Sequence, residues 1–453
     1  MTMVNGRKFA RVIETRLPKG YLPLHEDAIS TVLTCATTFQ KRPRGKRLTL
    51  ESKSELRIEE SPQLQFVLLL VHRANSAASY TKADFSLCTF QVNTMSETMR
   101  FHFLGQSGLR VSELCLGTMT FGEDWGWGAS KEECRAIFNS YVERGGNFID
   151  TANGYTNGTS ERIVGGLISS ERDKFVLATK YSFPTVRGDP NSGGNHRKSM
   201  IRSLEGSLKR LGTDYIDLFW LHAWDFSTTV EEVMRALDDL VRSGKVLYVG
   251  VSDTPAWIVS RANMLAELRG WSPFIALQIE YSLIERTPER DLLPMARNLG
   301  MTVTPWAVLG AGVLTGKYND APPATKNVGT SGGHVERRLD ATNSQKANDR
   351  NLAIARVVVE VAKQIGSSPS QVALAWLRTR PGSIVPILGA RSLDQIRDNL
   401  TCLDVTLPEE HLRRLDEASK IELGFPHAFL ASPVGRDRLY GGLYSRMAQH
   451  REP

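Results

Sequence analysis

The sequence predicts an α/β protein folded as a (β/α)8 barrel, and three observations support this fold class. From about residue 99 onward, short apolar runs alternate with amphipathic helical segments. The runs are apolar almost throughout, which is typical of parallel strands that are covered on both faces. Eight such units fit between residues 99 and 390, which suits a closed barrel better than an open, doubly wound sheet.

A β-hairpin is expected to cap the barrel before its first strand. Residues 99–113 (MRFHFLGQSGLRVSE) hold two β-rich runs around a glycine-containing turn, which is typical of a hairpin. The eight barrel strands are then expected, in chain order, at 112–117, 148–152, 175–180, 215–222, 245–252, 274–281, 302–308 and 383–390.

Amphipathic segments between these runs predict the covering helices. We expect helices at 130–145, 160–171, 197–212, 229–244 and 255–270. Several of them end in Gly, as helix C-termini often do. The glycine-rich stretch 309–316 (LGAGVLTG) lacks the G-x-G-x-x-G spacing, and no G-x-x-x-x-G-K-[ST] occurs, so a Rossmann or P-loop interpretation is disfavoured.

Residues 1–94 differ in character from the rest of the chain. They hold 14 Lys+Arg and 8 Asp+Glu, which accounts for +6 of the net charge of +7. They show no sustained helical or strand period, so we expect a largely disordered basic extension, either a leader or sequence foreign to the protein, before a barrel at 95–453. Because the barrel part carries only +1, we expect no nucleic-acid partner.

Cysteine spacing and hydropathy indicate the cellular compartment and whether the chain binds metal or crosses a membrane. The five cysteines are widely spaced and form no C-x-x-C, which disfavours a disulfide framework or a zinc cluster and fits a reducing compartment. No run approaches the ~20 apolar residues that a membrane-spanning helix needs. We therefore expect a cytoplasmic protein with no membrane partner and no bound metal.

Polar residues stand at the ends of three consecutive predicted strands. Asp150 ends the second strand and Tyr155 follows it, Lys180 ends the third, and His222 ends the fourth. Taken singly, such a Lys usually just reaches the protein surface, and such a His is usually a core residue whose hydrogen bonds are satisfied. Such an Asp often caps a helix. Because functional residues of a barrel gather at the C-terminal ends of its strands, the coincidence of all four predicts an active site.

These four side chains suit proton transfer to a carbonyl. The Tyr155 hydroxyl holds a proton at neutral pH and can give it to an oxygen that gains negative charge. Lys180 would lower the pKa of Tyr155, Asp150 would hold the ammonium, and His222 would orient the carbonyl by a hydrogen bond. Hydride must come from a cofactor such as NAD(P)H, because no side chain supplies it.

The chain from about 99 to 425 resembles the aldo-keto reductases. Motifs typical of that family recur in family order: GTMTFG (117–122), FIDTANGY (148–155), LATK (177–180), DYIDLFWLH (214–222), LQIEYSL (277–283), VLTGKY (313–318) and PILGARSLDQIRDN (386–399). Three further motifs, GNHRKSM (194–200), HAWD (222–225) and GVSDTPAW (250–257), resemble the aryl-alcohol dehydrogenase-like branch. The resemblance implies a TIM barrel that interconverts aldehydes or ketones with alcohols by using NADPH.

The resemblance also implies the roles of individual residues. The tetrad would be Asp150, Tyr155, Lys180 and His222, with Tyr155 as the general acid. Ser252 and Gln278 would hold the nicotinamide carboxamide, with Asp253 standing where the family commonly has Asn, and Trp306 would stack on the nicotinamide ring. The other cofactor contacts implied are Gly117, Thr118, Met119, Asp150, Ala307, Leu309, Gly310, Gly312, Lys317, Gly389, Ala390, Arg391, Gln395 and Asn399.

Phosphate binding has a physical basis in two of these segments. The glycines after the seventh strand permit close backbone approach, and Lys317 adds a cation for the pyrophosphate. Gly389 and Ala390 precede a predicted helix, whose first N–H groups and dipole attract a phosphate. Arg391 adds a fixed charge suited to a 2′-phosphate, which favours NADP over NAD.

Aromatic residues predict the substrate side of the site. Trp125, Trp127 and Trp224 would join Tyr155 and His222 in a pocket suited to flat aromatic aldehydes. The partner is therefore a small carbonyl or alcohol, and the oligomeric state is left open. The alternative is a cofactor-sensing regulatory subunit that resembles potassium channel β subunits. The basic extension leaves this alternative open, because a charged tail could bind a partner, whereas the intact tetrad disfavours it.

Overall fold

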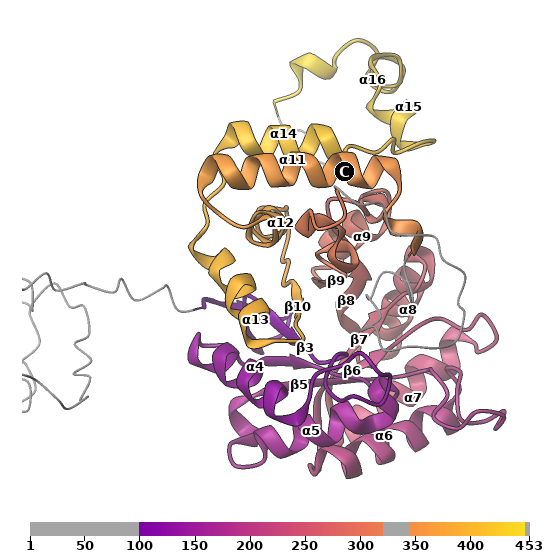
Figure 1. Cartoon of the computed structure of the whole chain (residues 1–453). Coiled ribbons are helices and arrows are strands. Elements are labelled where there is room, and N and C mark those ends of the chain that lie inside the picture. The colour runs from indigo at the N-terminus through magenta and orange to yellow at the C-terminus, as the bar shows by residue number, and fades with distance from the viewer. Residues whose placement is uncertain (1–98, 320–343, 449–453) are drawn as a thin grey trace, which may run out of the picture. The chain divides into compact units, whose positions relative to one another are not determined.

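A computed structural model describes residues 99–319 and 344–448 of the chain. These residues contain the barrel and the helices that cover it (Figure 1). The predictions made for residues 1–94 lie outside the described residues. No helix in the described part of the chain is long and apolar enough to cross a membrane.

Eight parallel strands form the barrel wall. They are β3 (Cys115–Gly117), β4 (Phe148–Asp150), β5 (Val176–Tyr181), β6 (Ile216–Leu221), β7 (Val246–Ser252), β8 (Phe274–Glu280), β9 (Thr302–Trp306) and β10 (Ile387–Gly389). The strand order is β10-β3-β4-β5-β6-β7-β8-β9. The wall closes where the Val303 amide donates to Ser383 O (2.8 Å) and the Val385 amide donates to Val303 O (2.9 Å). The predicted barrel is confirmed, and each strand overlaps its expected range.

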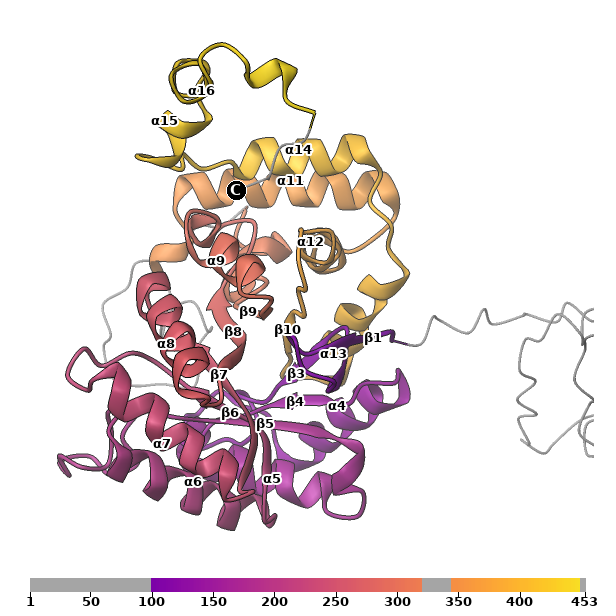
Figure 2. The same ribbon diagram turned by 180° about the vertical axis from the view of Figure 1, so that it is seen from behind.

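The predicted hairpin is also confirmed, and it fills the end of the barrel where the strands begin. Strands β1 (Phe101–Phe103) and β2 (Arg110–Ser112) pair antiparallel, close to β3 and β10 (Figure 2). Leu104 and Val111 are fully buried in the cluster that fills the barrel interior. The Gly105 amide donates to Thr302 Oγ1 (2.7 Å) at the start of β9. Because this end is plugged, a ligand must enter at the opposite end.

Helices cover the outside of the barrel. They are α4 (Lys131–Glu143), α5 (Thr159–Ile168), α6 (Arg197–Leu211), α7 (Val230–Arg242), α8 (Ala256–Arg269), α9 (Leu292–Asn298), α11 (Asp349–Ile365), α12 (Pro369–Arg378), α13 (Leu393–Leu400) and α14 (Glu409–Ser419). The hydroxyls of Ser130 and Thr229 cap α4 and α7, and left-handed glycines such as Gly212 and Gly270 end α6 and α8. The five helices expected from the sequence are therefore all present.

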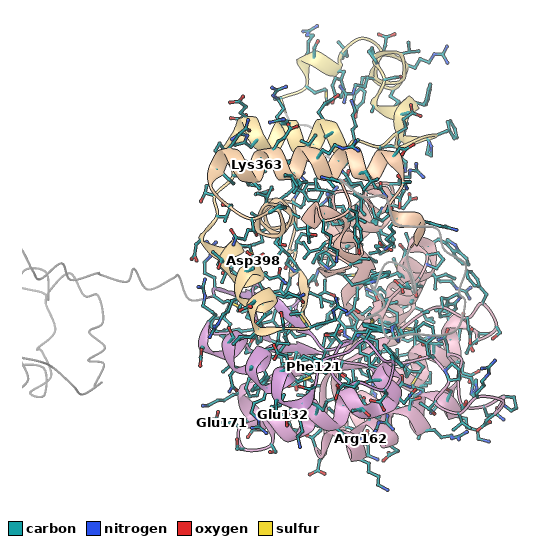
Figure 3. The ribbon with its side chains drawn as sticks, viewed as in Figure 1. Phe121, Glu132, Arg162, Glu171, Lys363 and Asp398 are labelled. Atoms are coloured by element: carbon teal, nitrogen blue, oxygen red, sulfur yellow. The ribbon has the colours of Figure 1, made fainter. Side chains whose placement is uncertain are left out.

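Burial follows the layers of the fold. Phe121 is fully buried behind the barrel wall, whereas Glu132, Arg162, Glu171 and Lys363 project from the surface into solvent (Figure 3). After α14, the chain continues into the short helices α15 (His427–Ala431) and α16 (Pro433–Tyr440). The apolar core therefore lies between strands and helices and within the barrel, and the polar groups at the strand ends stand apart from it.

Candidate active site

The barrel brings three of the four predicted catalytic residues to neighbouring strands. Asp150 is the last residue of β4, Lys180 lies near the end of β5, and His222 follows β6. The Lys180 ammonium is fully buried and forms an ion pair with the Asp150 carboxylate. It also donates to Thr151 O (2.8 Å) and to the Tyr155 hydroxyl (3.2 Å). One buried cation therefore joins the carboxylate to the phenol.

A strained turn positions Tyr155. The residue opens the 3-10 turn η1 (Tyr155–Gly158), in which Thr156 and Asn157 have φ angles of 44° and 54°. The Thr156 hydroxyl donates to Phe121 O (2.7 Å) and accepts from the Ser160 amide (3.0 Å), so it ties the turn to two neighbouring segments. These contacts support the left-handed backbone, which non-glycine residues seldom adopt.

The environment keeps the proton on Tyr155. Burial raises the pKa of its hydroxyl, and Asp150 adds to the rise, whereas Lys180 opposes it; the net pKa lies above 10.0. The lowering by Lys180 expected from the sequence is present but is outweighed by burial. For Lys180, burial acts to lower the pKa, but the interactions with Asp150 and Tyr155 outweigh burial. The pKa of Lys180 is therefore raised. Both groups hold their protons at neutral pH.

His222 lies at the edge of the Tyr155 ring. The ring centroids are 6.1 Å apart in an edge-on arrangement, and the Phe183 ring lies 4.3 Å from the imidazole on another side. Burial, together with the charge of Lys180, lowers the pKa of His222 well below 6.5, so the imidazole is neutral. Its Nδ1 is buried and meets no hydrogen-bond partner among the described residues. A neutral imidazole can still donate one hydrogen bond to a substrate oxygen.

Two loops that frame His222 are fastened to each other by Asn195 and Asp225. The backbone N–H of Asn195 donates to Asp225 Oδ2 (2.7 Å), and the backbone N–H of Asp225 donates to Asn195 Oδ1 (2.8 Å). The Asn195 side chain also donates to Ser182 Oγ (2.9 Å), which in turn accepts from the His222 amide (3.2 Å). Sequence reasoning did not identify this pair, although both residues lie in the motifs GNHRKSM and HAWD.

Ser252 and Gln278 lie at the ends of β7 and β8, beside the tetrad. The side-chain NH2 group of Gln278 donates to Asp150 Oδ1 (3.0 Å), so the orientation of the Gln278 carboxamide is fixed. The Ser252 hydroxyl is buried and meets no hydrogen-bond partner among the described residues. A buried hydroxyl without a partner next to an oriented amide fits the donor and acceptor needs of a nicotinamide carboxamide.

Trp306 lies half-buried at the end of β9 with its indole held in place. Its Nε1 donates to Asp253 Oδ1 (3.3 Å). The Lys346 ammonium, which is paired with Glu280, lies 5.7 Å from the centroid of the indole ring. Ala307, directly after Trp306, has a positive φ of 50°. The indole is therefore fastened from two sides, as a stacking platform requires.

The glycine-rich segment after β9 forms the 3-10 turn η4 (Gly310–Thr315). Gly310 and Gly312 have φ angles of 56° and 90°, and a Cβ at Gly312 would lie 2.8 Å from the Lys317 ammonium. Leu309 directly precedes the turn. The turn thus needs glycine, and it brings the Lys317 ammonium close to the backbone. The Gly310 and Gly312 amides already donate to Ala307 O (2.7 Å) and Leu309 O (2.9 Å), so Lys317 is the group here that suits a pyrophosphate best.

The start of α13 differs from the expectation of free N–H groups. The Leu393 amide donates to Glu133 Oε1 (2.5 Å), and the Arg391 amide donates to Gln395 Oε1 (2.9 Å). None of the ion pairs among the described residues involves the Arg391 guanidinium. Side chains therefore already occupy two of the backbone donors at this end. Asn399 Nδ2 lies 3.5 Å from Gly389 O, and Ala390 is buried.

Gly117 is the last residue of β3, and Thr118 and Met119 follow it. Gly117 and Thr118 are buried, and a Cβ at Gly117 would lie 2.5 Å from a methyl group of Ile387. The Thr118 hydroxyl donates to Asp150 O (3.0 Å). Thr118 therefore supports the backbone of Asp150, and Met119, half-buried, is the one of the three with exposed surface.

Aromatic side chains lie in the loops that follow these strands. Trp125 and Trp127 lie with ring centroids 5.5 Å apart, and Trp224, half-buried, packs against the core. Phe183, which contacts His222, is 48% exposed. A flat apolar group can lie against such rings.

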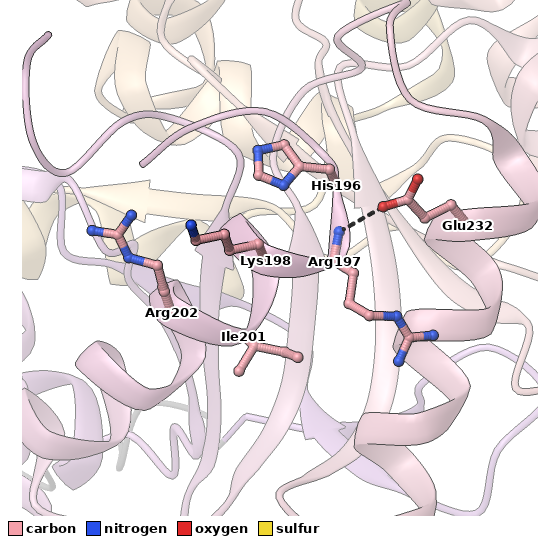
Figure 4. Close-up of a pocket in the computed structure, with 6 residues that line it drawn as sticks. All are labelled: His196, Arg197, Lys198, Ile201, Arg202 and Glu232. Atoms are coloured by element: carbon pink, nitrogen blue, oxygen red, sulfur yellow. Dashed lines mark hydrogen bonds between the residues drawn. The ribbon is translucent and has the colours of Figure 1, made fainter. Parts of the chain in front are cut away.

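An open groove between the N-terminal parts of α6 and α7 is separate from this site. It is lined by His196, Arg197, Lys198, Ile201, Arg202 and Glu232 (Figure 4). The Arg197 amide donates to Glu232 (3.0 Å), and the Arg202 guanidinium pairs with Asp189 (2.9 Å). Because carboxylates of the same chain take up these groups, we assign the groove no part in the reaction.

The described residues contain no group of three or more His, Cys, Asp or Glu side chains placed to hold a metal ion. The fold and the site together define a class: a (β/α)8 barrel whose strand ends hold a tyrosine hydroxyl beside a buried Lys–Asp pair.

Comparison with known proteins identifies the family. Residues 113–420 match the aldo/keto reductase family model. The chain is 39% identical over 338 residues to norsolorinic acid reductase of Aspergillus flavus, covering 72% of this chain and 82% of that protein. It is 40% identical over 342 residues to norsolorinic acid reductase B of Dothistroma septosporum, covering 72% and 83%. It is 38% identical over 335 residues to aryl-alcohol dehydrogenase [NADP(+)] of Phanerodontia chrysosporium, covering 71% and 86%.

The chain belongs to the aldo/keto reductase family, in its aryl-alcohol dehydrogenase-like branch. It is an oxidoreductase that acts on carbonyl and alcohol groups of small molecules with a nicotinamide cofactor.

Proposed function

We propose that this enzyme interconverts aromatic aldehydes or ketones and their alcohols with NADP(H), and that Tyr155 is the general acid. The observation that carries the proposal is the buried Lys180 ammonium, which pairs with Asp150 and donates to the Tyr155 hydroxyl at 3.2 Å. The neutral His222 beside Tyr155 adds a hydrogen-bond donor for the carbonyl oxygen. Two groups thus converge on the place where negative charge develops.

The residues act in sequence during carbonyl reduction. NADPH, when bound, supplies the hydride that no side chain can provide. As the carbonyl carbon gains the hydride, the Tyr155 O–H bond breaks and its proton passes to the carbonyl oxygen. Lys180 stabilises the phenolate that is left, and Asp150 keeps the ammonium in place. Alcohol oxidation uses the same groups in reverse, with Tyr155 as the base.

Binding of the cofactor would use the strand ends and the two phosphate segments. Ser252 and Gln278 hold the carboxamide, and Trp306 provides the stacking surface. The Arg391 guanidinium, which joins no ion pair within residues 99–319 and 344–448, and the name of the Phanerodontia chrysosporium relative support NADP over NAD. The remaining contacts with Gly117, Thr118, Met119, Ala307, Leu309, Gly310, Gly312, Lys317, Gly389, Ala390, Gln395 and Asn399 stay part of this proposal.

An aromatic substrate suits the loops around His222. Trp125, Trp127 and Trp224 offer flat apolar surface, and relatives of this chain are named for an aryl alcohol and for norsolorinic acid. A panel of aromatic and aliphatic aldehydes and ketones, assayed by NADPH and NADH oxidation, tests both the substrate class and the cofactor preference. Negligible turnover on the whole panel, with tight cofactor binding, would instead favour the sensor alternative.

Tyr155→Phe tests the general acid directly. We expect kcat for aldehyde reduction to fall at least about 100-fold, because general acid catalysis contributes that much or more. The dissociation constant for NADPH should stay near the wild-type value, measured by isothermal titration calorimetry. Tyr215→Phe is the matched control, because the Tyr215 hydroxyl bonds Asp173 (2.9 Å) at the start of β6, at the other end of the barrel. Full activity in Tyr155→Phe would refute the assignment.

A further inference from the structure

We propose that Asp253 makes this site prefer the oxidised cofactor over the reduced one, and that it thereby favours hydride transfer toward the carbonyl. The inference rests on the proposed function, since it needs a nicotinamide ring beside Trp306. It concerns the charge of one side chain at the end of β7.

Asp253 is held at the centre of the proposed nicotinamide site. Its carboxylate Oδ1 accepts the indole N–H of Trp306 (3.3 Å). Its carbonyl accepts from the Trp224 amide (3.3 Å), and its own amide donates to Gln278 O (3.4 Å). The backbone has a positive φ of 38°, a conformation that needs support from such contacts. The position of the carboxylate is therefore defined by three strand ends and not by a free loop.

Asp253 is also the one of three carboxylates at these strand ends, with Asp150 and Glu280, that is not balanced by a paired cation among the described residues. Asp150 is paired with the Lys180 ammonium, and Glu280 is paired with the Lys346 ammonium. Asp253 takes part in none of the ion pairs found among the described residues, and its hydrogen-bonded partner is an uncharged indole. The two pairs are each close to neutral overall. Burial raises the pKa of Asp253 to about 6, although the Trp306 hydrogen bond and Lys180 oppose the rise, so at neutral pH Asp253 is mostly ionised and supplies the unbalanced negative charge.

The oxidised nicotinamide ring carries a positive charge, and the reduced ring carries none. A carboxylate held beside the ring therefore attracts the oxidised form and leaves the reduced form nearly unaffected. Tighter binding of the oxidised form shifts the equilibrium between the two bound states toward carbonyl reduction, because that direction produces NADP⁺. An Asn at this position would keep the acceptor for the indole and lose the charge.

Asp253→Asn separates charge from position. We expect the ratio of the dissociation constants of NADP⁺ and NADPH to rise on the order of fivefold, through weaker NADP⁺ binding, as expected for a charge partly screened by water. Both constants are measured by isothermal titration calorimetry on the full-length protein at neutral pH, so the readout does not depend on turnover. Trp306→Phe should change both constants together, because it removes stacking area and the indole N–H.

Asp173→Asn is the matched control, because it removes an exposed carboxylate at the end of the barrel where the strands begin. An unchanged ratio in Asp253→Asn, or equal weakening of both forms with thermal stability retained, overturns the inference. Failure of the wild-type protein to bind either nucleotide would instead overturn the proposed function.

Discussion

The proposed reaction depends, at the scale of single residues, on which protons the buried side chains hold at neutral pH. Burial raises the pKa of the Tyr155 hydroxyl, and it lowers the pKa of His222 together with the charge of Lys180. One group therefore keeps its proton and the other stays neutral. Both features arise from the same buried environment, and they suit a phenol that donates and an imidazole that orients.

His222 makes the stability of the protein depend on pH. Its pKa in the folded state lies well below 6.5, so the unfolded state binds a proton that the folded state does not as pH falls below about 6.5. Folding free energy is therefore lost as pH falls, by up to about 1.4 kcal/mol per pH unit from this residue. Urea unfolding between pH 7.5 and 5.5 should show a smaller loss for His222→Gln than for wild type.

His102→Gln is the control for this measurement, because it removes a half-exposed histidine of β1. The argument fails if His222→Gln loses stability with pH as steeply as wild type and His102→Gln do.

The loops after β5 and β6 show, at the scale of elements, how the fold fixes the substrate side. Asn195 is fully buried and bonds to both Asp225 and Ser182, and Ser182 accepts from the His222 amide. These bonds join one loop to the other through side chains, and they place Phe183 against the imidazole. The motifs that contain Asn195 and Asp225 were recognised in the sequence, but their pairing is a contact between distant segments.

Asn195→Ala should loosen these loops. We expect a loss of about 1–3 kcal/mol in folding free energy, because buried partners lose their hydrogen bonds. The KM for aldehyde should rise more than the dissociation constant for NADPH, since the Asn195 bonds hold the loops around His222, and one contact from these loops, that of the Trp224 amide, reaches Asp253. Asn191→Ala, an exposed change in the same loop, serves as the control. Equal KM values in the two variants would argue against a positioning role.

Strand positions were predicted well because apolar runs of four to eight residues report burial on both faces. Their ends shifted by up to four residues: β10 begins at Ile387 and not at Ser383, and β3 begins at Cys115 and not at Ser112. Ser112 belongs to β2 instead, because the hairpin extends into the expected first strand. Pairing partners decide such boundaries, and local hydropathy does not record them.

The two ends of the barrel have separate tasks at the scale of the whole molecule. The hairpin β1–β2 plugs one end with Leu104 and Val111, and the tetrad lies at the other. Gly105 is needed for this plug, since its φ is 58° and an added Cβ would lie 2.2 Å from Ile275 O. Stability and catalysis can therefore be changed independently of each other.

Gly105→Ala tests that separation. We expect a loss of at least about 2 kcal/mol in folding free energy, from backbone strain and the contact with Ile275. The folded fraction should keep the wild-type dissociation constant for NADPH. Gly108→Ala in the same turn is the control, because its added Cβ would meet open space. Equal melting temperatures for the two variants would contradict this account of the plug.

The sequence by itself determined the barrel and the tetrad, because both depend on local order: apolar runs define strands, and polar residues at strand ends must meet at one edge. Only the tertiary structure decided the rest. It revealed the rise in the pKa of Tyr155, the engagement of backbone donors at the start of α13, and the bond between Trp306 and Asp253. Burial and contacts between distant segments exist only once the chain has folded, so no local pattern records them.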